Sequence, residues 1–292
     1  MNSLFGPLDD VAGDAGHVDH PPRVGFFTDT SVCIGCKACE VACKQWNGVP
    51  AAEHLDLLGM SHDNTGALGA NAWRHVAFIE QTVQSKPVDS VDLGMPAVDG
   101  LRWLMASDVC KHCTHAGCLD VCPTGALFRT EFGSVVVQQD ICNGCGYCVP
   151  ACPFGVLDRR ESDGRVWKCT LCYDRLKDDL EPACAKACPT DSIQFGPYDE
   201  LVEVAERRVA ALHERGVEGA YLYGVSDDPS GDLAGGLGAF FLLTEKPERY
   251  GLPAQAESPI QENVVPATLA AMGAGLLAAA GVAAAFLWEK SR

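Results

Sequence analysis

The cysteines constrain this chain more than any other residue type. The 292-residue sequence holds 16 of them, and all fall into four groups of four. The stretch CNGCGYCVPACP at 142–153 places four thiols within eleven residues and a proline after the last. Numbered in chain order, the groups are Cys33, Cys36, Cys39 and Cys43; Cys110, Cys113, Cys118 and Cys122; Cys142, Cys145, Cys148 and Cys152; and Cys169, Cys172, Cys184 and Cys188.

Three chemistries use clustered cysteines, and spacing separates them. Disulfide frameworks are typical of short secreted chains without a large core, whereas 47% of this chain is hydrophobic, and cysteines three apart bridge poorly. A structural zinc site needs two separated pairs, and does not need three thiols at steps of three. The run C-x-x-C-x-x-C-x-x-x-C-P is that of bacterial ferredoxins, whose fourth cysteine binds a second cluster. The spacing therefore predicts iron–sulfur clusters.

The four groups are variants of one design. Groups two, three and four end in Cys-Pro, at Pro123, Pro153 and Pro189, whereas Lys44 follows group one. Proline fixes φ and lacks an N–H donor, which turns the chain away after the ligand. Because the fourth cysteine crosses to a partner cluster, the groups must work in pairs, which predicts four [4Fe–4S] clusters. No cysteine position in the groups is substituted, which disfavours a three-iron centre.

The charge of the chain excludes one class of partner. Its formal net charge is −17, from 39 acidic and 22 basic residues, whereas nucleic-acid binding needs basic patches. Residues 1–25 predict an acidic arm punctuated by glycine and proline. This arm lacks the basic start and apolar centre of a signal peptide, so no export signal is expected in it.

The C-terminal region differs sharply in composition. Residues 264–288 carry no charge, and as a helix these 25 residues would extend roughly 37 Å, enough to cross a bilayer core. The alternative is a buried helix of a soluble protein. A stripe of small residues at steps of four favours a membrane helix packed against a neighbour. The stripe consists of Ala267, Ala271, Gly275, Ala279 and Ala283.

We expect an α+β fold with tandem ferredoxin-like dicluster modules, pseudo-duplicated, an inserted strand region and one C-terminal transmembrane helix. The insertion at 44–109 predicts strands at 73–81 and 101–108. Residues 133–140 predict a further strand before group three. The expected divisions are the acidic arm at 1–25, a four-cluster domain at 26–199, a packing region at 200–262, a transmembrane helix at 263–289 and a tail at 290–292.

The packing region predicts a helix, a strand and a linker. Asp199 is expected to cap an amphipathic helix that ends at Gly216. Residues 238–253 predict a short strand and a proline-bounded linker to the membrane span. The apolar face of the helix consists of Leu201, Val204, Ala205, Val209 and Leu212.

Two further residue types lie among the cysteines. His112 and His115 are interpreted as loop residues, because the cysteine set is already complete. Basic residues beside the cluster loops would raise reduction potentials; the alternative is that each is a solvated side chain. These are Lys37, Lys44, Arg165, Lys168, Arg175 and Lys177. The sequence shows no P-loop or nucleophile motif, which predicts an electron carrier without a catalytic site.

Four motifs together are similar to the iron–sulfur β subunit of membrane-bound formate dehydrogenases. The resemblance extends through DNTGALGANAWRHVAFIEQ, the helix at 199–216 and the terminal span, over residues 25–290. Asp191 departs from the glycine usual in the fourth motif, at a turn position that Asp tolerates. The motifs are CIGCKACEVACKQWN, CKHCTHAGCLDVCPTGAL, CNGCGYCVPACPFGV and KCTLCYDRLKDDLEPACAKACPT.

The resemblance implies how the cysteines pair and which partners the protein has. A large catalytic subunit with a molybdenum or tungsten pterin would oxidise formate. An integral membrane subunit, either a cytochrome b or a haem-free type, would reduce quinone. The implied ligand sets are Cys33, Cys36, Cys39 and Cys188 for cluster 1; Cys110, Cys113, Cys118 and Cys152 for cluster 2; Cys142, Cys145, Cys148 and Cys122 for cluster 3; and Cys169, Cys172, Cys184 and Cys43 for cluster 4.

Two other functions stay open from the sequence. One is the equivalent relay subunit of a hydrogenase or a sulfur-compound reductase. The other is a self-contained ferredoxin-like carrier that docks at membranes.

The short tail predicts an orientation in the membrane. Lys290 and Arg292 follow the span, and basic residues favour the cytoplasmic side. The iron–sulfur head is therefore expected on the outer, periplasmic face, although Lys246 and Arg249 on the head side reduce the contrast. A partner with a twin-arginine signal would carry the folded head across, and the resemblance implies the same arrangement.

Overall fold

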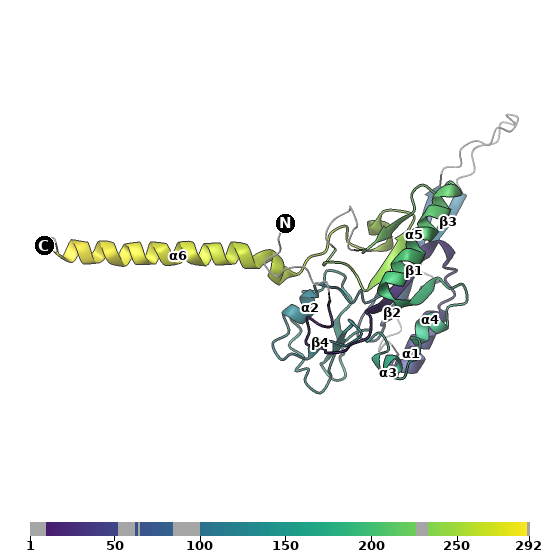
Figure 1. Ribbon diagram of the computed structural model, residues 1–292, viewed down its shortest axis with the longest axis horizontal. Coiled ribbons are helices and arrows are strands. Elements are labelled where there is room, and N and C mark those ends of the chain that lie inside the picture. The colour runs from purple at the N-terminus through teal and green to yellow at the C-terminus, as the bar shows by residue number, and fades with distance from the viewer. Residues whose placement is uncertain (1–9, 52–61, 64, 84–99, 226–232, 291–292) are drawn as a thin grey trace, which may run out of the picture.

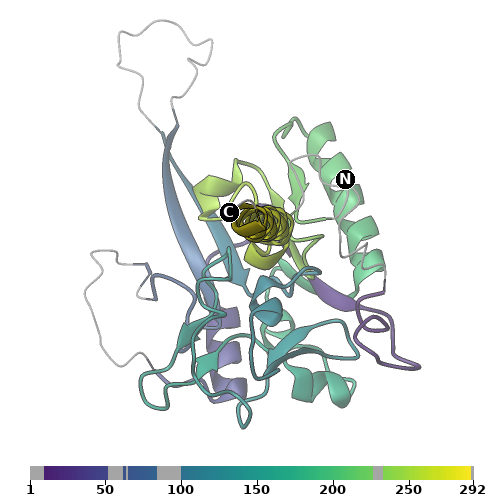
Figure 2. The same ribbon diagram turned by 90° about the vertical axis from the view of Figure 1, so that its left-hand side faces the viewer.

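The computed structural model describes residues 10–51, 62–63, 65–83, 100–225 and 233–290. They form a head of short strands, helices and loops, from which one long helix projects (Figure 1). Viewed along that helix, the head lies around the N-terminal end, or root, of the helix (Figure 2).

A four-stranded sheet lies at the centre of the head, in the order β8–β1–β10–β9. Strand β1 runs parallel to β10, whereas the β1–β8 and β10–β9 pairs are antiparallel. The strand expected after residue 238 is β10, and all five of its residues are buried. Phe240 of β10 stacks on Phe27 of β1, with 5.4 Å between ring centroids. The bounds are β1 Val24–Asp29, β8 Ile193–Pro197, β9 Tyr221–Tyr223 and β10 Ala239–Leu243.

Helix α5 (Tyr198–Glu214) covers one face of this sheet. It buries Leu201, Ala205 and Leu212, which belong to the predicted apolar face. The predicted cap was wrong: Pro197 is the N-cap residue and no side chain caps the helix. Asp199 lies instead in the first turn, where a carboxylate is favourable to the helix dipole. The helix stops before Gly216, whose φ of +81° suits a glycine.

Both strands predicted between residues 44 and 109 are present. Strands β2 (Arg74–Val83) and β3 (Gly100–Val109) form an antiparallel pair in which Arg74 lies opposite Val109. Helix α1 (Ala38–Asn47) packs against α4 (Ala183–Lys186) and β2. The cysteines of group one therefore lie beside those of group four.

The remaining cysteine loops contain only short elements, because glycines, prolines and left-handed residues interrupt them. The strand predicted at 133–140 is present but shorter, as β5. These elements are the 3₁₀ helix η1 Thr30–Val32, α2 Gly117–Asp120, β4 Leu127–Arg129, β5 Val135–Val137, β6 Asp158–Arg159, β7 Val166–Trp167 and α3 Tyr173–Lys177. Strand β4 pairs with β5 and β6 with β7, both antiparallel.

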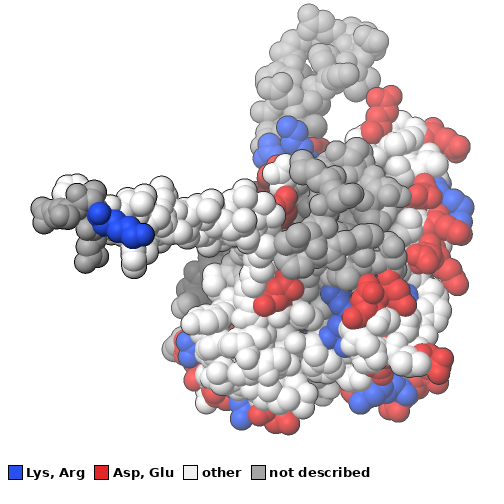
Figure 3. All heavy atoms as spheres, turned by 60° about the vertical axis from the view of Figure 1, so that its left-hand side comes forward, with Lys and Arg blue, Asp and Glu red and all other residues white. Residues whose placement is uncertain are grey.

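Helix α6 (Pro259–Lys290) follows the expected linker, which contains the 3₁₀ helix η2 (Pro247–Tyr250). Its segment Asn263–Trp288 is long and apolar enough to cross a membrane, with a mean hydropathy of 2.0 and no buried residue. Figure 3 shows the projecting helix white along its length, with Lys or Arg only near its far end. Acidic groups are scattered over the head in the same view. The predicted apolar helix is therefore present and does not pack into the head.

The described part of the N-terminal arm contacts the head. Val11 and Ala12 are buried, and the Nε2 atom of His17 lies 2.9 Å from the carbonyl oxygen of Arg129. Residues 1–9 of the expected arm lie outside the described residues.

Candidate iron–sulfur sites

The structure gathers the cysteines into four sets of four. Three sets each line one cavity, and each cavity takes three cysteines from one group and one from another. The cysteines of the fourth set are buried together within electrostatic range of one another. We number the sets as site 1 (Cys33, Cys36, Cys39, Cys188), site 2 (Cys110, Cys113, Cys118, Cys152), site 3 (Cys142, Cys145, Cys148, Cys122) and site 4 (Cys169, Cys172, Cys184, Cys43).

These sets bring together the residues that the resemblance implied. Cys152 of group three lines the cavity of group two, and Cys122 of group two lines the cavity of group three. Cys188 likewise joins group one. The fourth cysteine of each group thus turns towards another group's loop, as in ferredoxin runs.

One backbone feature recurs in all four loops. The residue just before the second cysteine of each group has a left-handed backbone. At Gly144 a side chain would also meet the carbonyl oxygen of Gly164 at 2.3 Å. His112 and Leu171 adopt the same conformation at a steric cost that glycine does not have. The four φ values are +66° at Gly35, +45° at His112, +72° at Gly144 and +58° at Leu171.

Burial makes many of the buried thiols poor acids. It raises the pKa of Cys43 and of Cys113 to about 12, and that of Cys148 to about 11, with neighbouring thiols adding to the effect. Bound metal reverses this, because a coordinating thiol is deprotonated outright. The donor set therefore suits a metal that can supply positive charge to all four sulfurs.

The sulfurs also face hydrogen-bonding groups. The N–H of Leu171 donates to the Sγ of Cys169 at 3.3 Å, and the Ser107 hydroxyl lies 3.2 Å from the Sγ of Cys39. The amide of Asn47 reaches the sulfurs of Cys43 and Cys172 at 3.7 and 3.8 Å. Hydrogen bonds to sulfur are one means of setting the potential of an iron–sulfur cluster.

The sets fit a cubane better than a single ion. Within the described ranges, no three His, Cys, Asp or Glu side chains converge closely enough to hold one metal ion. A [4Fe–4S] cluster is larger and takes four cysteine ligands. Four thiols around one cavity match that ligand count, so the residues present fit the group that the spacing predicted.

Lys168 and Arg74 are buried between the sites. Lys168 was among the predicted basic residues, and its Nζ lies 3.5 Å from the Sγ of Cys110. The sequence did not identify Arg74 as a residue near the sites, because nothing in WRHV distinguishes it from an exposed strand residue. Burial alone lowers the pKa of the Arg74 guanidinium, but the surrounding thiolates raise it above its ordinary value.

Four other predicted basic residues hold the loops or face solvent, and the charge of Arg175 also acts on Cys172. Lys44 donates to the carbonyl oxygen of Asn71 at 2.6 Å, and the Arg175 guanidinium lies 4.1 Å from the ring centroid of Trp46. Arg165 and Lys177 are exposed. These four residues therefore hold the loops or face solvent.

His112 has a hydrogen-bonding role in its loop. The N–H of Val135 donates to its Nδ1 at 3.1 Å. Burial, together with the charges of Lys168 and Arg129, holds the pKa of His112 well below its ordinary value. The ring is therefore neutral, with its proton on Nε2.

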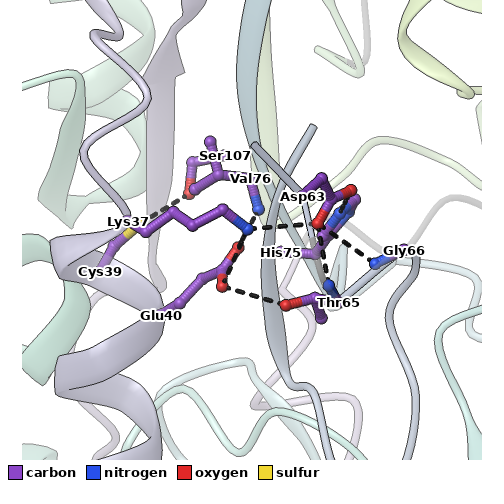
Figure 4. A network of polar contacts seen from close by, with 9 residues as sticks. All are labelled: Lys37, Cys39, Glu40, Asp63, Thr65, Gly66, His75, Val76 and Ser107. Carbon is purple, nitrogen blue, oxygen red and sulfur yellow. Dashed lines mark hydrogen bonds and ion pairs between the residues drawn. The ribbon is translucent and has the colours of Figure 1, made fainter. Parts of the chain in front are cut away.

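A buried polar network supports the loop of site 1 (Figure 4). The Nζ of Lys37 lies 3.2 Å from a carboxylate oxygen of Glu40 and 3.2 Å from one of Asp63. His75 contacts the other oxygen of Asp63 at 2.7 Å. Glu40 also accepts from the N–H of Val76. Helix α1, strand β2 and the segment around residue 63 are thereby tied together beside Cys36 and Cys39.

The comparisons with known proteins agree with this geometry. Two family models described as 4Fe-4S dicluster domain match residues 32–126 and 101–198. The formate dehydrogenase iron–sulfur subunit of Haemophilus influenzae is 40% identical over 272 residues, which cover 91% of this chain and 80% of that protein. The nitrate-inducible formate dehydrogenase iron–sulfur subunit of Escherichia coli is 41% identical over 239 residues, 80% of this chain and 74% of that protein.

A more distant relative belongs to an enzyme with a different reaction. The B subunit of the anaerobic dimethyl sulfoxide reductase of Escherichia coli is 34% identical over 184 residues, 61% of this chain and 76% of that protein. The two matched models define the class of this chain as proteins with 4Fe-4S dicluster domains. Within that class, the chain belongs to the family of formate dehydrogenase iron–sulfur subunits, and its role is electron transfer without catalysis.

We expect Asp63→Asn to destabilise the head. Burial opposes ionisation of Asp63, but hydrogen bonds from His75 and two backbone N–H groups lower its pKa to about 2. Because an unfolded Asp titrates near 3.9, this stabilisation is present above about pH 4 and is lost as the pH falls towards 2. At pH 7 the variant should lose about 3 kcal/mol of unfolding free energy, measured by chemical denaturation. The exposed Asp178→Asn is the control, and equal stability of both variants would contradict the assigned role.

Proposed function

We propose that this protein relays electrons through four [4Fe–4S] clusters, from a formate-oxidising molybdenum or tungsten pterin subunit to a quinone-reducing membrane subunit. One observation carries the proposal: an exposed cysteine lies at two of the four sites, which suits a row of clusters with an accessible one at each end. Of the 16 cysteines, two are exposed, Cys36 of site 1 and Cys145 of site 3. Partners could therefore reach sites 1 and 3, whereas no cysteine of sites 4 and 2 is exposed.

Contacts between the sites support the order 1–4–2–3. Cys39 of site 1 lies within electrostatic range of Cys184 of site 4. Cys169 of site 4 lies within range of Cys110 of site 2. Sites 2 and 3 exchange their fourth ligands, Cys152 and Cys122.

The ends of this row of sites differ in their position relative to α6. Helix α2 lies beside the root of α6, whereas α1, which carries cysteines of sites 1 and 4, lies further away (Figure 1). Ser258, just before α6, donates to a carboxylate oxygen of Asp120 in α2 at 2.7 Å. These contacts support the pair of sites 2 and 3 as the end nearer the membrane; within that pair the exposed Cys145 favours site 3, and site 1 would then be nearest the catalytic partner.

The protein's own residues bind, orient and shield the clusters. When bound, each cluster would accept and release one electron without bond rearrangement in a substrate. The left-handed residues aim paired thiols at one point, and the hydrophobic side chains around sites 2 and 4 exclude water. The network around Asp63 holds helix α1, and with it Cys39 and Cys43, in place.

The same proposal includes the division of the sequence into regions. Residues 26–199 would be a pseudo-duplicated pair of dicluster modules with an inserted strand region at 44–109. Residues 1–25 would be an arm, 200–262 a packing region, 263–289 a transmembrane helix and 290–292 a tail. The sheet crosses one of these boundaries: strands β9 and β10 belong to the packing region, but they complete the sheet that contains β1 of the 26–199 region.

A second candidate is the equivalent subunit of a sulfur-compound reductase, favoured by the 34% identity to the B subunit of dimethyl sulfoxide reductase. Purification of the tagged protein in mild detergent, followed by mass spectrometry, separates the two. A large pterin-containing partner that oxidises formate with a dye acceptor is expected. A partner that reduces sulfoxides instead would replace the first function with the second, and isolation without a large partner would contradict both.

Metal analysis tests the number of clusters. Four cubanes contain about sixteen iron and sixteen acid-labile sulfide per protein molecule, and we expect these amounts after anaerobic purification. Stoichiometric zinc with little iron would overturn the iron–sulfur assignment. Half the expected iron would mean that two sites lack clusters and would contradict a relay of four.

The crossed ligation of sites 2 and 3 can be tested at one cysteine. We expect Cys152→Ser to damage the cluster held by Cys110, Cys113 and Cys118, because Cys152 lines their cavity. Low-temperature EPR of the reduced complex should lose the site 2 signal, and Cys122→Ser should lose the site 3 signal. Loss of the site 3 signal in Cys152→Ser would show that each group binds its own cluster.

The orientation of the head is a further prediction. Lys290 and Arg292 follow the apolar segment, which favours a cytoplasmic C-terminus and an outer, periplasmic head. A fluorescent protein fused after Arg292 should stay bright in intact spheroplasts while added protease digests the head. A protected head would place the sites on the cytoplasmic side.

A further inference from the structure

Two buried cations lie at the junctions between successive sites. Lys168 and Arg74 are among the largest fully buried side chains of the described residues. Both stand inside a strongly acidic protein, whose net charge is −17 before any thiolate is counted. Their positions relative to the cysteine sites give a reason why two charged side chains are buried there.

Lys168 joins site 4 to site 2. It directly precedes Cys169 of site 4 in the sequence. Its Nζ donates to the carbonyl oxygen of Cys169 at 2.9 Å and lies 3.5 Å from the Sγ of Cys110 of site 2. One ammonium group therefore contacts ligand residues of both sites, at the point where the pair of sites 1 and 4 meets the pair of sites 2 and 3.

Arg74 occupies the junction between site 1 and site 4. Its charge acts on Cys39 of site 1 and on Cys43 and Cys184 of site 4. Its Nη1 donates to the hydroxyl of Ser107 at 3.0 Å, and that hydroxyl in turn lies 3.2 Å from the Sγ of Cys39.

The other two nitrogens of Arg74, Nε and Nη2, are buried and make no hydrogen bond of ordinary geometry. The thiol of Cys184 of site 4 is the side chain that the guanidinium reaches as a further hydrogen-bond partner. A buried donor without a well-placed partner is costly, so the N–H groups on these two nitrogens point to an acceptor at the sites they face. The sulfur atoms of a bound cluster are acceptors of that kind.

No carboxylate of the described residues neutralises either cation. The ion pairs in this part of the protein include neither Lys168 nor Arg74. Lys111, by contrast, is equally buried but pairs with Asp108. The charges of Lys168 and Arg74 therefore act on the cysteine sites.

We propose that Lys168 and Arg74 are redox-positioning residues, each of which raises the reduction potential of the two clusters that it lies between. Addition of an electron makes a cluster more negative, and a nearby buried cation stabilises that reduced state. Because each cation acts on two sites, it raises both potentials together and stabilises the transferred electron on either side of the junction. The inference rests on the proposed four-cluster relay.

The test is a redox titration of the whole complex, followed by EPR of the individual clusters. Lys168→Gln should lower the midpoint potentials of sites 4 and 2 and leave site 1 unchanged. Arg74→Gln should lower those of sites 1 and 4 and leave site 3 unchanged. Lys168→Arg and Arg74→Lys keep the charge and should restore native potentials. The exposed Lys177→Gln makes the same change of charge in solvent and should shift no site.

Each outcome decides the inference. A neutral variant with full iron and native potentials would overturn it, as would equal shifts at all four sites. If both neutral variants lose iron while the charge-conserving variants keep it, the cations hold the thiolates in place and do not tune them. Fewer than four clusters in the native complex would instead count against the proposed function, which separates the two failures.

Discussion

The repulsion between thiolates held together in a buried setting is the constraint on which this structure depends. Each site gathers four sulfurs, and burial makes the charged form of most of them costly, as the pKa of about 12 at Cys43 shows. Iron would carry most of the compensating charge. The protein adds positive charge through the buried side chains of Lys168 and Arg74. It also directs N–H dipoles at the sulfurs, as the N–H of Leu171 does at Cys169. The fold can be understood as the arrangement that brings these groups to the sulfurs.

Local spacing predicted much of this arrangement. The steps of three between cysteines require tight loops, and the left-handed residues at Gly35 and Gly144 meet that requirement where glycine permits it. Strands β2 and β3 and the helices α5 and α6 follow from periodicity or from long apolar runs. Asp191 also behaves as expected, since its φ of +50° shows the turn conformation that Asp tolerates.

What the sequence did not reveal depends on contacts between distant segments. Arg74 is buried because β3 and the loops of groups one and four close around it, and no local pattern marks such a residue. Asp63 and His75 form their pair twelve residues apart, through a segment without a recognisable motif. The mistaken cap at Asp199 has a similar cause, because β8 runs directly into α5 and Pro197 occupies the capping position. Tertiary packing decides these details.

The parallel pairing of β1 with β10 has a consequence for how the protein is made. Phe26 lies opposite Ala239, so the central sheet joins the beginning of the head to a strand near its end. During synthesis, almost the whole head is made after β1 and before β10, its parallel neighbour, emerges from the ribosome. Strand β10 ends at Leu243 and the apolar helix already begins at Pro259. Completion of the sheet and emergence of the apolar helix therefore nearly coincide, so that little time separates the folding of the head from the exposure of a segment that water solvates poorly.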